Sequence, residues 1–202
     1  MNIGILNYNA CNLASIYNSI YRLGYDPIVI NKVNEFKNID KLIVPGVGAA
    51  KSCLEYMKNN NFVDEIQNFL VKGKPILGIC LGLQIFSKNL FEHGKTNGLD
   101  FLNAEVIPFK NLKTNMGWFN LVLKDNEILN DFNNKSFYFC HTYYLNFLNL
   151  NEKKYCFGLT DNENNIPSII IKKNFMGVQF HPEKSQGNGN KFLDKFLSWE
   201  PK

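Results

Sequence analysis

The segment Lys74–Gln84 reads K-P-I-L-G-I-C-L-G-L-Q, and it decides which fold the chain adopts. Its first part, Pro75–Ile79, is a short apolar run of the kind that forms a strand buried on both faces. Cys80 follows between two glycines, and the apolar pattern after it predicts a helix over Leu81–Phe91. A strand that turns into a helix is the repeating connection of an α/β protein with a parallel sheet.

The sequence on the N-terminal side of this segment repeats the alternation. Three more short apolar runs predict buried strands: Asn2–Leu6, Pro27–Ile30 and Lys41–Val44. Between the runs, apolar residues recur at helical spacing, first up to Gly24 and then from Leu54 to Leu70, with an interruption near Asn59–Asn61. These βαβ units predict a largely parallel central sheet flanked by helices.

The sequence on the C-terminal side differs, because no good helix separates its strands. Six segments combine strand-like composition with short connecting turns: Ala104–Pro108, Trp118–Leu123, Ser136–Tyr144, Tyr155–Thr160, Ser168–Ile171 and Phe175–Phe180. Strands joined this closely pair mainly antiparallel, and an amphipathic helix is predicted at Lys191–Trp199. We therefore expect one α/β domain over residues 1–202, with a mixed, largely parallel sheet and an antiparallel β-rich second half.

Composition and charge exclude several classes of function. The 202 residues are 45% hydrophobic and 20% charged, which is typical of a globular chain and not of a disordered one. The net charge of +4 comes without a Lys/Arg run, which argues against nucleic-acid and membrane partners. No secretory signal or bilayer-spanning stretch is recognisable, and the five cysteines lack C-x-x-C spacing. We expect a cytoplasmic chain with no disulfide framework, metal site or cofactor.

The pattern G-x-C-x-G over Gly78–Gly82 places Cys80 where a nucleophile is needed. A nucleophile on a sharp strand-to-helix turn has a strained backbone, and residues two positions away must be small. The helix N-terminus favours the thiolate, and the Leu81 amide points to where an oxyanion would form. A buried structural cysteine beside packing glycines would give the same letters, but the flanking strand and helix favour the nucleophile.

His181, within the V-Q-F-H-P-E segment, is the candidate base. A strand is predicted to end at Phe180, and Pro182 biases His181 toward an extended conformation. Residues two apart in an extended segment point to the same side, so His181 can face Cys80 while Glu183 accepts from its other ring nitrogen. The three residues would form a nucleophile–base–orienter triad; a solvated surface turn is the alternative.

The other two histidines and one glycine-rich turn give weaker signals. His93 is expected at a helix C-terminus, where its charge would cap the helix. His141 lies in an aromatic segment, where it is either a satisfied structural residue or a residue that shapes the pocket. The turn Pro45-Gly46-Val47-Gly48 follows a strand, and its backbone amides could form half of an oxyanion hole. It is not a phosphate loop, because no G-K-[ST] follows.

Together, these segments resemble the class I, or triad-type, glutamine amidotransferases. P-G-V-G at 45–48, G-I-C-L-G-L-Q at 78–84 and G-V-Q-F-H-P-E-K-S at 177–185 occur in the order of that family and span almost the whole chain. Within the family, the stand-alone size, Met116-Gly117-Trp118 and the Tyr138–Tyr144 segment are most similar to the glutaminase subunits of imidazole glycerol phosphate synthase, which serve histidine biosynthesis.

The resemblance implies that the chain hydrolyses L-glutamine to glutamate and ammonia. Cys80 would attack the side-chain carboxamide, and His181 would take the thiol proton and later protonate the departing ammonia. Backbone amides of Val47, Gly48 and Leu81 would stabilise the oxyanion. By the same resemblance, four further residues would contact the substrate: Gln84, Glu92, Thr142 and Tyr143. The Glu92 carboxylate suits the α-ammonium group of glutamine.

The resemblance also implies a partner. Ammonia released into water would largely become ammonium, which is not a nucleophile, so a glutaminase of this kind delivers it directly to a synthase. In the resembled enzymes the synthase is a (β/α)8-barrel cyclase, which would form a heterodimer with this chain around the mouth of the active site. The resemblance implies no nucleic acid, membrane, metal or cofactor.

Two segments depart from the family pattern. Thr114-Asn115 stands where Pro-His usually precedes Met-Gly-Trp, Phe119 replaces the usual Asn after Trp, and residues 7–12 replace a more usual Asp-Tyr-Gly-x-Gly-Asn. The triad is intact, so these departures bear on the partner and on activation. Three alternatives follow: a paralogous glutaminase that feeds a sugar-amidinating synthase of surface-glycan biosynthesis, a catalytically idle regulatory relative, and a γ-glutamyl peptidase on the same fold.

Overall fold

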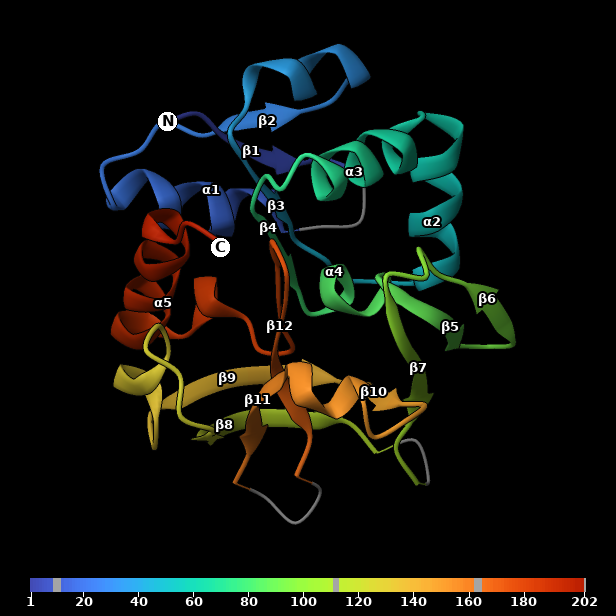
Figure 1. Cartoon of the computed structure of the whole chain (residues 1–202), viewed down its shortest axis with the longest axis vertical. Coiled ribbons are helices and arrows are strands. Elements are labelled where there is room, and N and C mark those ends of the chain that lie inside the picture. The colour runs from blue at the N-terminus through green and yellow to red at the C-terminus, as the bar shows by residue number, and fades with distance from the viewer. Residues whose placement is uncertain (9–11, 111–112, 162–164, 202) are drawn as a thin grey trace.

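The computed structural model describes residues 1–8, 12–110, 113–161 and 165–201 (Figure 1). Its strands are β1 (Ile3–Leu6), β2 (Ile28–Ile30), β3 (Lys41–Val44), β4 (Ile76–Ile79), β5 (Ser87–Phe91), β6 (Lys95–Asn97), β7 (Leu102–Pro108), β8 (Asn115–Leu123), β9 (Ser136–His141), β10 (Tyr143–Phe147), β11 (Cys156–Thr160), β12 (Pro167–Lys172) and β13 (Phe175–Val178). Its α-helices are α1 (Leu13–Arg22), α2 (Ala50–Asn59), α3 (Phe62–Val71), α4 (Leu81–Gln84) and α5 (Gln186–Ser198).

The strands of the described residues form two sheets. The larger sheet has the order β2-β1-β3-β4-β13-β12-β11-β8-β9, and the smaller has the order β10-β7-β5-β6. From β2 to β13 every neighbour is parallel, whereas β12, β11, β8 and β9 continue antiparallel. The predicted fold class, a mixed α/β sheet with an antiparallel second half, is therefore confirmed.

The parallel part of the large sheet is covered by helices on both faces. Side chains alternate along a strand. In β3, Ile43 accordingly packs with α1 and α5, while Leu42 and Val44 pack with α2 and α3. Figure 1 shows these two helix pairs on opposite sides of the sheet. Burial on both faces explains why the strands read as continuous apolar runs in the sequence.

The helix predicted over Leu81–Phe91 is wrong in its second half. The helix α4 has four residues, and the chain then enters β5, which pairs with β6 and β7. The backbone amide of Leu99 donates to the Ile85 carbonyl over 2.8 Å, so long-range backbone pairing replaces the helix that local pattern favours. His93 consequently lies in the β5–β6 turn with a φ of 52°, and not at a helix C-terminus.

The strand predicted over Ser136–Tyr144 is two strands in different sheets. β9 pairs with β8 in the large sheet, and β10 pairs with β7 in the small one. Thr142 lies at the bend between them, where its carbonyl accepts the Phe109 amide over 3.1 Å. The bend brings residues of both sheets to one place, which the site described below uses.

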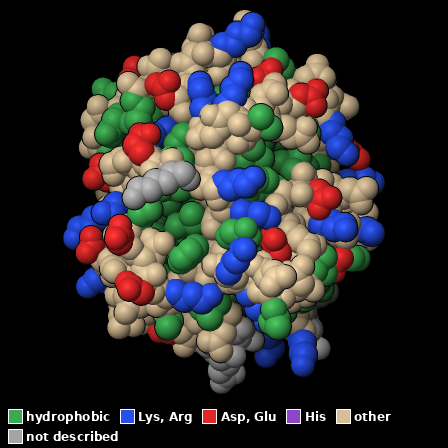
Figure 2. Space-filling view, in the orientation of Figure 1, with side chains coloured by type: hydrophobic (Ala, Val, Ile, Leu, Met, Phe, Trp, Pro, Cys, Tyr) green, Lys and Arg blue, Asp and Glu red, His purple; other side chains and the backbone are tan. Residues whose placement is uncertain are grey.

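The surface carries charges of both signs. On the face in Figure 2, basic and acidic side chains are spread among one another. None of the helices in the described ranges is both long and apolar enough to cross a bilayer. Of the cysteines in those ranges, Cys53, Cys80, Cys140 and Cys156 are free, and Cys11 lies outside the described residues.

Candidate active site

The backbone at Cys80 is strained in the way the G-x-C-x-G pattern predicts. Cys80 joins β4 to α4 with φ 52° and ψ −107°, a conformation that side-chain-bearing residues rarely adopt. A Cβ atom on Gly82 would lie 1.8 Å from the Val44 carbonyl oxygen, and one on Gly78 would lie 2.5 Å from the Gly82 carbonyl oxygen. Only glycine fits at both positions, so the turn requires the pattern.

His181 and Glu183 lie together beside Cys80. The His181 Nδ1–H donates to Glu183 Oε1 over 2.8 Å, and both side chains are almost fully buried. The His181 ring also lies close enough to the Cys80 sulfur for that sulfur to raise the pKa of the ring, and both residues line one cavity. The second Glu183 oxygen, Oε2, is buried and accepts no hydrogen bond from any described group. The carboxylate therefore acts mainly on the imidazole.

The charge of His181 depends on these two neighbours. Burial by itself lowers the pKa of His181, but the Cys80 sulfur and the Glu183 carboxylate outweigh it and raise the pKa to about 10. An imidazolium beside a thiolate is the resting state of an activated cysteine nucleophile.

The H-P-E turn is held in place by hydrogen bonds to β9. The His181 backbone amide donates to the Tyr138 carbonyl over 2.9 Å. Ser185 closes the turn, because its Oγ donates to the His181 carbonyl over 2.6 Å and accepts the Tyr138 amide over 2.9 Å. Pro182 begins a 3-10 turn, Pro182–Lys184, that directs Glu183 back toward the ring.

A cavity of about 300 Å³ opens over the Cys80 turn. It is lined by Val47, Gly48, Cys80, Leu81, Gln84, Glu92, Cys140, His141, Thr142, Tyr143, His181 and Lys184. The structure thus gathers every site residue predicted from the sequence around one cavity, apart from Glu183, which lies behind His181. Lys184 and Cys140 also line it, although sequence reasoning assigned them no role.

The Pro45–Gly48 turn packs directly against the start of α4. A Cβ atom on Gly46 would lie 2.5 Å from the Gly82 amide nitrogen, and the buried Tyr8 hydroxyl donates to the Pro45 carbonyl. Gly48 has a φ of 93°, which glycine adopts without strain. Leu81 is the first residue of α4, so its amide has no partner within the helix. Residues of both segments, Val47, Gly48 and Leu81, line the cavity.

The residues predicted to contact substrate have defined protein partners. The Gln84 amide nitrogen donates to the Tyr143 carbonyl over 2.9 Å and to Gln179 Oε1 over 3.0 Å. Glu92 Oε2 accepts the Ala50 backbone amide over 2.7 Å, which caps α2. The side chains at the cavity are therefore held in place before any ligand arrives.

His141 is buried and neutral. Its Nδ1–H donates to the Tyr143 carbonyl over 2.8 Å, so its Nε2 accepts from the Asn115 side-chain amide over 3.1 Å. Burial, with a smaller contribution from the nearby His181 charge, lowers the pKa of His141 to about 4, although the hydrogen bond to the Tyr143 carbonyl opposes the shift. His141 is both satisfied and part of the cavity wall, which are the two roles that its aromatic surroundings predicted.

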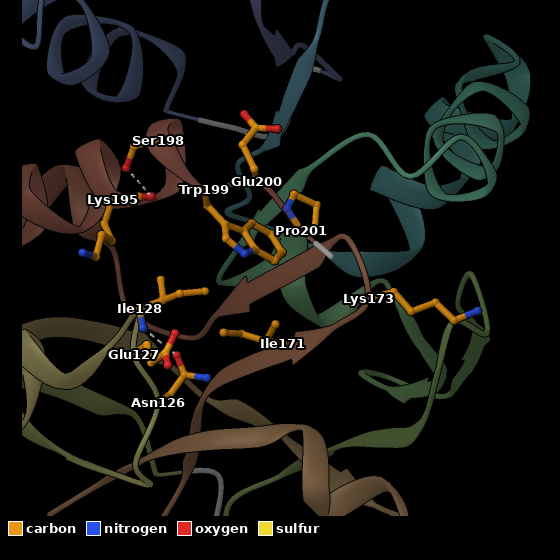
Figure 3. Close-up of a pocket in the computed structure, with 10 residues that line it drawn as sticks. All are labelled: Asn126, Glu127, Ile128, Ile171, Lys173, Lys195, Ser198, Trp199, Glu200 and Pro201. Atoms are coloured by element: carbon orange, nitrogen blue, oxygen red, sulfur yellow. Dashed lines mark hydrogen bonds between the residues drawn. The ribbon is translucent and has the colours of Figure 1, made fainter.

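A second cavity, of about 620 Å³, lies elsewhere and is larger than the cavity over Cys80 (Figure 3). Trp199 and Pro201, from the segment after α5, face Ile128 and Ile171 across it. None of its ten lining residues is cysteine or histidine, and it shares none with the cavity over Cys80. Nor does the described part of the chain hold a cluster of His, Cys, Asp and Glu suited to a metal ion. The candidate nucleophile and the candidate base therefore both line the smaller cavity.

Comparison with known proteins agrees with this geometry. The family described as glutamine amidotransferase class-I matches residues 5–198. The chain belongs to the class I glutamine amidotransferase family.

Its curated relatives are more specific. The imidazole glycerol phosphate synthase subunit HisH of Caldanaerobacter subterraneus subsp. tengcongensis is 39% identical over 198 residues, which cover 96% of each chain. A protein of Campylobacter jejuni named imidazole glycerol phosphate synthase subunit HisH 1 is 34% identical over 201 residues, which cover 96% of this chain and 98% of the relative.

Solved structures share the fold at lower identity. The structure titled PurLQS from Thermotoga maritima has a TM-score of 0.77 at 16% identity and covers 97% of each chain. A crystal structure of a glutamine amidotransferase has a TM-score of 0.72 at 18% identity, covering 96% of this chain and 98% of that one.

Proposed function

We propose that residues 1–202 form one glutaminase domain that hydrolyses L-glutamine to glutamate and ammonia, with Cys80, His181 and Glu183 as its triad. The observation that carries the proposal is the strained Cys80 turn facing an imidazole that is itself bound to a buried carboxylate. A cysteine that is only structural needs neither the strain nor the paired base.

The residues can carry each step of this reaction. The Cys80 thiolate attacks the carboxamide carbon of glutamine, and backbone amides of Leu81 and of the Val47–Gly48 turn receive the oxyanion. As the C–N bond breaks, protonated His181 gives its proton to the leaving nitrogen, and ammonia departs from a thioester. Water then attacks the thioester carbonyl while His181 takes a proton from the water. The C–S bond breaks, glutamate is released, and Cys80 returns to the thiolate form. Glu183 stabilises the imidazolium throughout.

The substrate would lie in the cavity over Cys80. The cavity of about 300 Å³ suits a molecule of the size of an amino acid, and Gln84, Glu92, Thr142 and Tyr143 line its walls. We assign the α-ammonium group of glutamine to the Glu92 carboxylate, which is the acidic side chain among the lining residues. The same lining includes Lys184, a cation for the α-carboxylate or for a partner.

We further propose that the partner is a (β/α)8-barrel cyclase that makes imidazole glycerol phosphate in cytoplasmic histidine biosynthesis. The relatives at 33–39% identity are named as subunits of that synthase, which supports a partner subunit. A face of β8 beside the cavity exposes Met116, Trp118 and Val122, each 46–60% accessible. Met116 pairs in register with Cys140, which lines the cavity, so this apolar face reaches the site.

The sharpest test pairs Cys80→Ser with Cys140→Ser, because both cysteines line the same cavity. Glutamate and ammonia formation are measured for the purified chain, alone and with the cyclase. We expect low activity alone, strong activation by the cyclase, loss of at least ~10³-fold in Cys80→Ser and little change in Cys140→Ser. Wild-type turnover in Cys80→Ser would contradict the proposal.

One observation favours a second candidate, a glutaminase that feeds a sugar-amidinating synthase. Two of the residues that depart from the family pattern contact the cavity wall: Thr114 Oγ1 lies 3.3 Å from Thr142 Oγ1, and Asn115 binds His141. These contacts link the departure to the site that a partner would activate. Affinity purification of the chain separates the candidates, since it recovers either the barrel cyclase or a sugar-modifying synthase.

A further inference from the structure

Gln179 is a buried polar residue that the mechanism above does not use. It follows β13 and precedes the H-P-E turn, and its exposed fraction is 0%. Its backbone amide is already bonded to the Ser168 carbonyl over 3.0 Å. Burying a side-chain amide is costly unless its oxygen and nitrogen find partners. Both partners of Gln179 belong to the active site.

The orientation of the Gln179 amide follows from a backbone carbonyl. The Tyr143 carbonyl can only accept, so Gln84 must present its nitrogen there. The same Gln84 nitrogen lies 3.0 Å from Gln179, which must therefore present its oxygen to Gln84. The Gln179 nitrogen is thereby turned toward Cys80, where it donates to Sγ over 3.5 Å.

We propose that Gln179 is a further catalytic residue of this glutaminase, which donates a neutral hydrogen bond to the Cys80 thiolate. The inference rests on the proposed function, since it assigns a role at the same nucleophile. The Gln179 donor lies beside the sulfur at every step, whatever the protonation state of His181. It therefore stabilises the thiolate before the attack and, together with the His181 that has taken the proton of water, as the leaving group when the thioester is hydrolysed.

The expected effect follows from the strength of a hydrogen bond to a charged group. Loss of such a bond lowers the thiolate fraction at a given pH about 10-fold. The pH profile of Cys80 alkylation should thus move about one unit toward higher pH. If the Gln179 amide had only a structural role, replacing it would change the stability of the chain and leave the pH profile of Cys80 alkylation unchanged.

The experiment uses the isolated full chain, iodoacetamide as probe, and peptide mass spectrometry to follow Cys80 as a function of pH. Gln179→Glu keeps the size and the oxygen that binds Gln84 but removes the donor, and Gln179→Met removes both. The matched control is Asn174→Asp. Asn174 is another buried amide near the sheet, and its nitrogen donates to the Phe69 and Lys74 carbonyls, 3.2 and 2.7 Å away.

Both Gln179 variants are expected to alkylate Cys80 about 10-fold more slowly near neutral pH, with the profile shifted upward, while Asn174→Asp keeps the wild-type profile. Gln179 variants that fold and keep the wild-type profile would overturn this inference and leave the proposed function intact. A wild-type Cys80 no more reactive than the exposed Cys140 would overturn the proposed function and the inference with it.

A measurement on the wild-type chain covers the case in which the variants do not fold. With ¹⁵N-labelled glutamine, the Gln179 side-chain amide signal should move when Cys80 is titrated and again when Cys80 is alkylated. A Gln179 amide signal that stays in place through both changes would overturn the inference.

Discussion

Replacing Gly82 with alanine tests the steric basis of the nucleophile turn. The added Cβ atom would lie 1.8 Å from the Val44 carbonyl oxygen, and contacts shorter than 3.0 Å essentially never occur for real Cβ atoms. The obstacle is backbone on a buried central strand, so no rotamer change relieves it. Either β3 or the start of α4 must therefore move by more than 1 Å.

Two magnitudes follow from this displacement. Overpacking a tight site costs about 3 kcal/mol at the upper end of the usual range, which corresponds to about 10 °C in melting temperature for a chain of this size. A shift of about 1 Å at a catalytic group can cost about 100-fold in rate. Because Gly82 is two residues from Cys80, we expect a 100-fold fall in kcat/KM for glutamine.

The assay combines urea unfolding with partner-activated glutaminase kinetics, and Gly187→Ala serves as the matched control. Gly187 lies in the first turn of α5, and an added Cβ atom there meets nothing within 4 Å. Alanine favours a helix over glycine, so the control should be neutral or slightly more stable. A Gly82→Ala chain with wild-type stability and wild-type kcat/KM would refute the steric reasoning.

The remaining predictions concern charge and helix packing. Burial lowers the pKa of His141 to about 4 against an ordinary value of 6.5, so the unfolded chain binds a proton first and stability falls as the pH drops through that window. The free energy of unfolding, measured in urea, should fall by about 3 kcal/mol less between pH 6.5 and pH 4 in His141→Gln than in the wild-type chain. An equal fall in both chains would refute the prediction. Glu183→Gln should lower the pKa of His181 from about 10 toward its ordinary value, as followed by histidine NMR. In the wild-type chain, the stability that protonated His181 contributes is present below pH 6.5 and is lost as the pH rises through about 10. In Glu183→Gln this stability should be lost at a lower pH. A His181 pKa that stays near 10 in the variant would contradict the prediction. Lys41 is 2% exposed, and its Nζ donates to two backbone carbonyls at the end of α5, so Lys41→Met should cost about 2 kcal/mol and speed hydrogen exchange there. The exposed Lys51, which forms an i,i+4 pair, provides the control, and Lys51→Met should cost less than about 1 kcal/mol; equal costs would count against the account.

The sequence was sufficient for the parallel half of the fold. Strands buried on both faces leave unbroken apolar runs, and Lys41–Val44 was predicted with the bounds that β3 has. The interruption near Asn59–Asn61 was also predicted, and there the backbone of Asn61 turns left-handed with a φ of 57° between α2 and α3. In both places the local chemistry and the tertiary structure favour the same conformation.

The errors arose where distant pairing overrides local pattern. The residues of β5 carry apolar spacing that suits a helix, and only their pairing with β6 and β7 makes them a strand. The break at Thr142 has the same cause, because β9 and β10 find partners in different sheets. The sequence motif does not predict a role for Gln179, because the orientation of its amide depends on Gln84, which is 95 residues away.

The most direct test of the account is to trap the covalent intermediate. The wild-type chain, its cyclase partner and L-glutamine are mixed, quenched in acid during turnover and digested for mass spectrometry. The account predicts a γ-glutamyl thioester on the peptide that contains Cys80, absent when glutamine is omitted and absent in His181→Ala, which lacks the proton donor for the leaving ammonia. Turnover of glutamine with no adduct on Cys80, or with the adduct on Cys140, would contradict it.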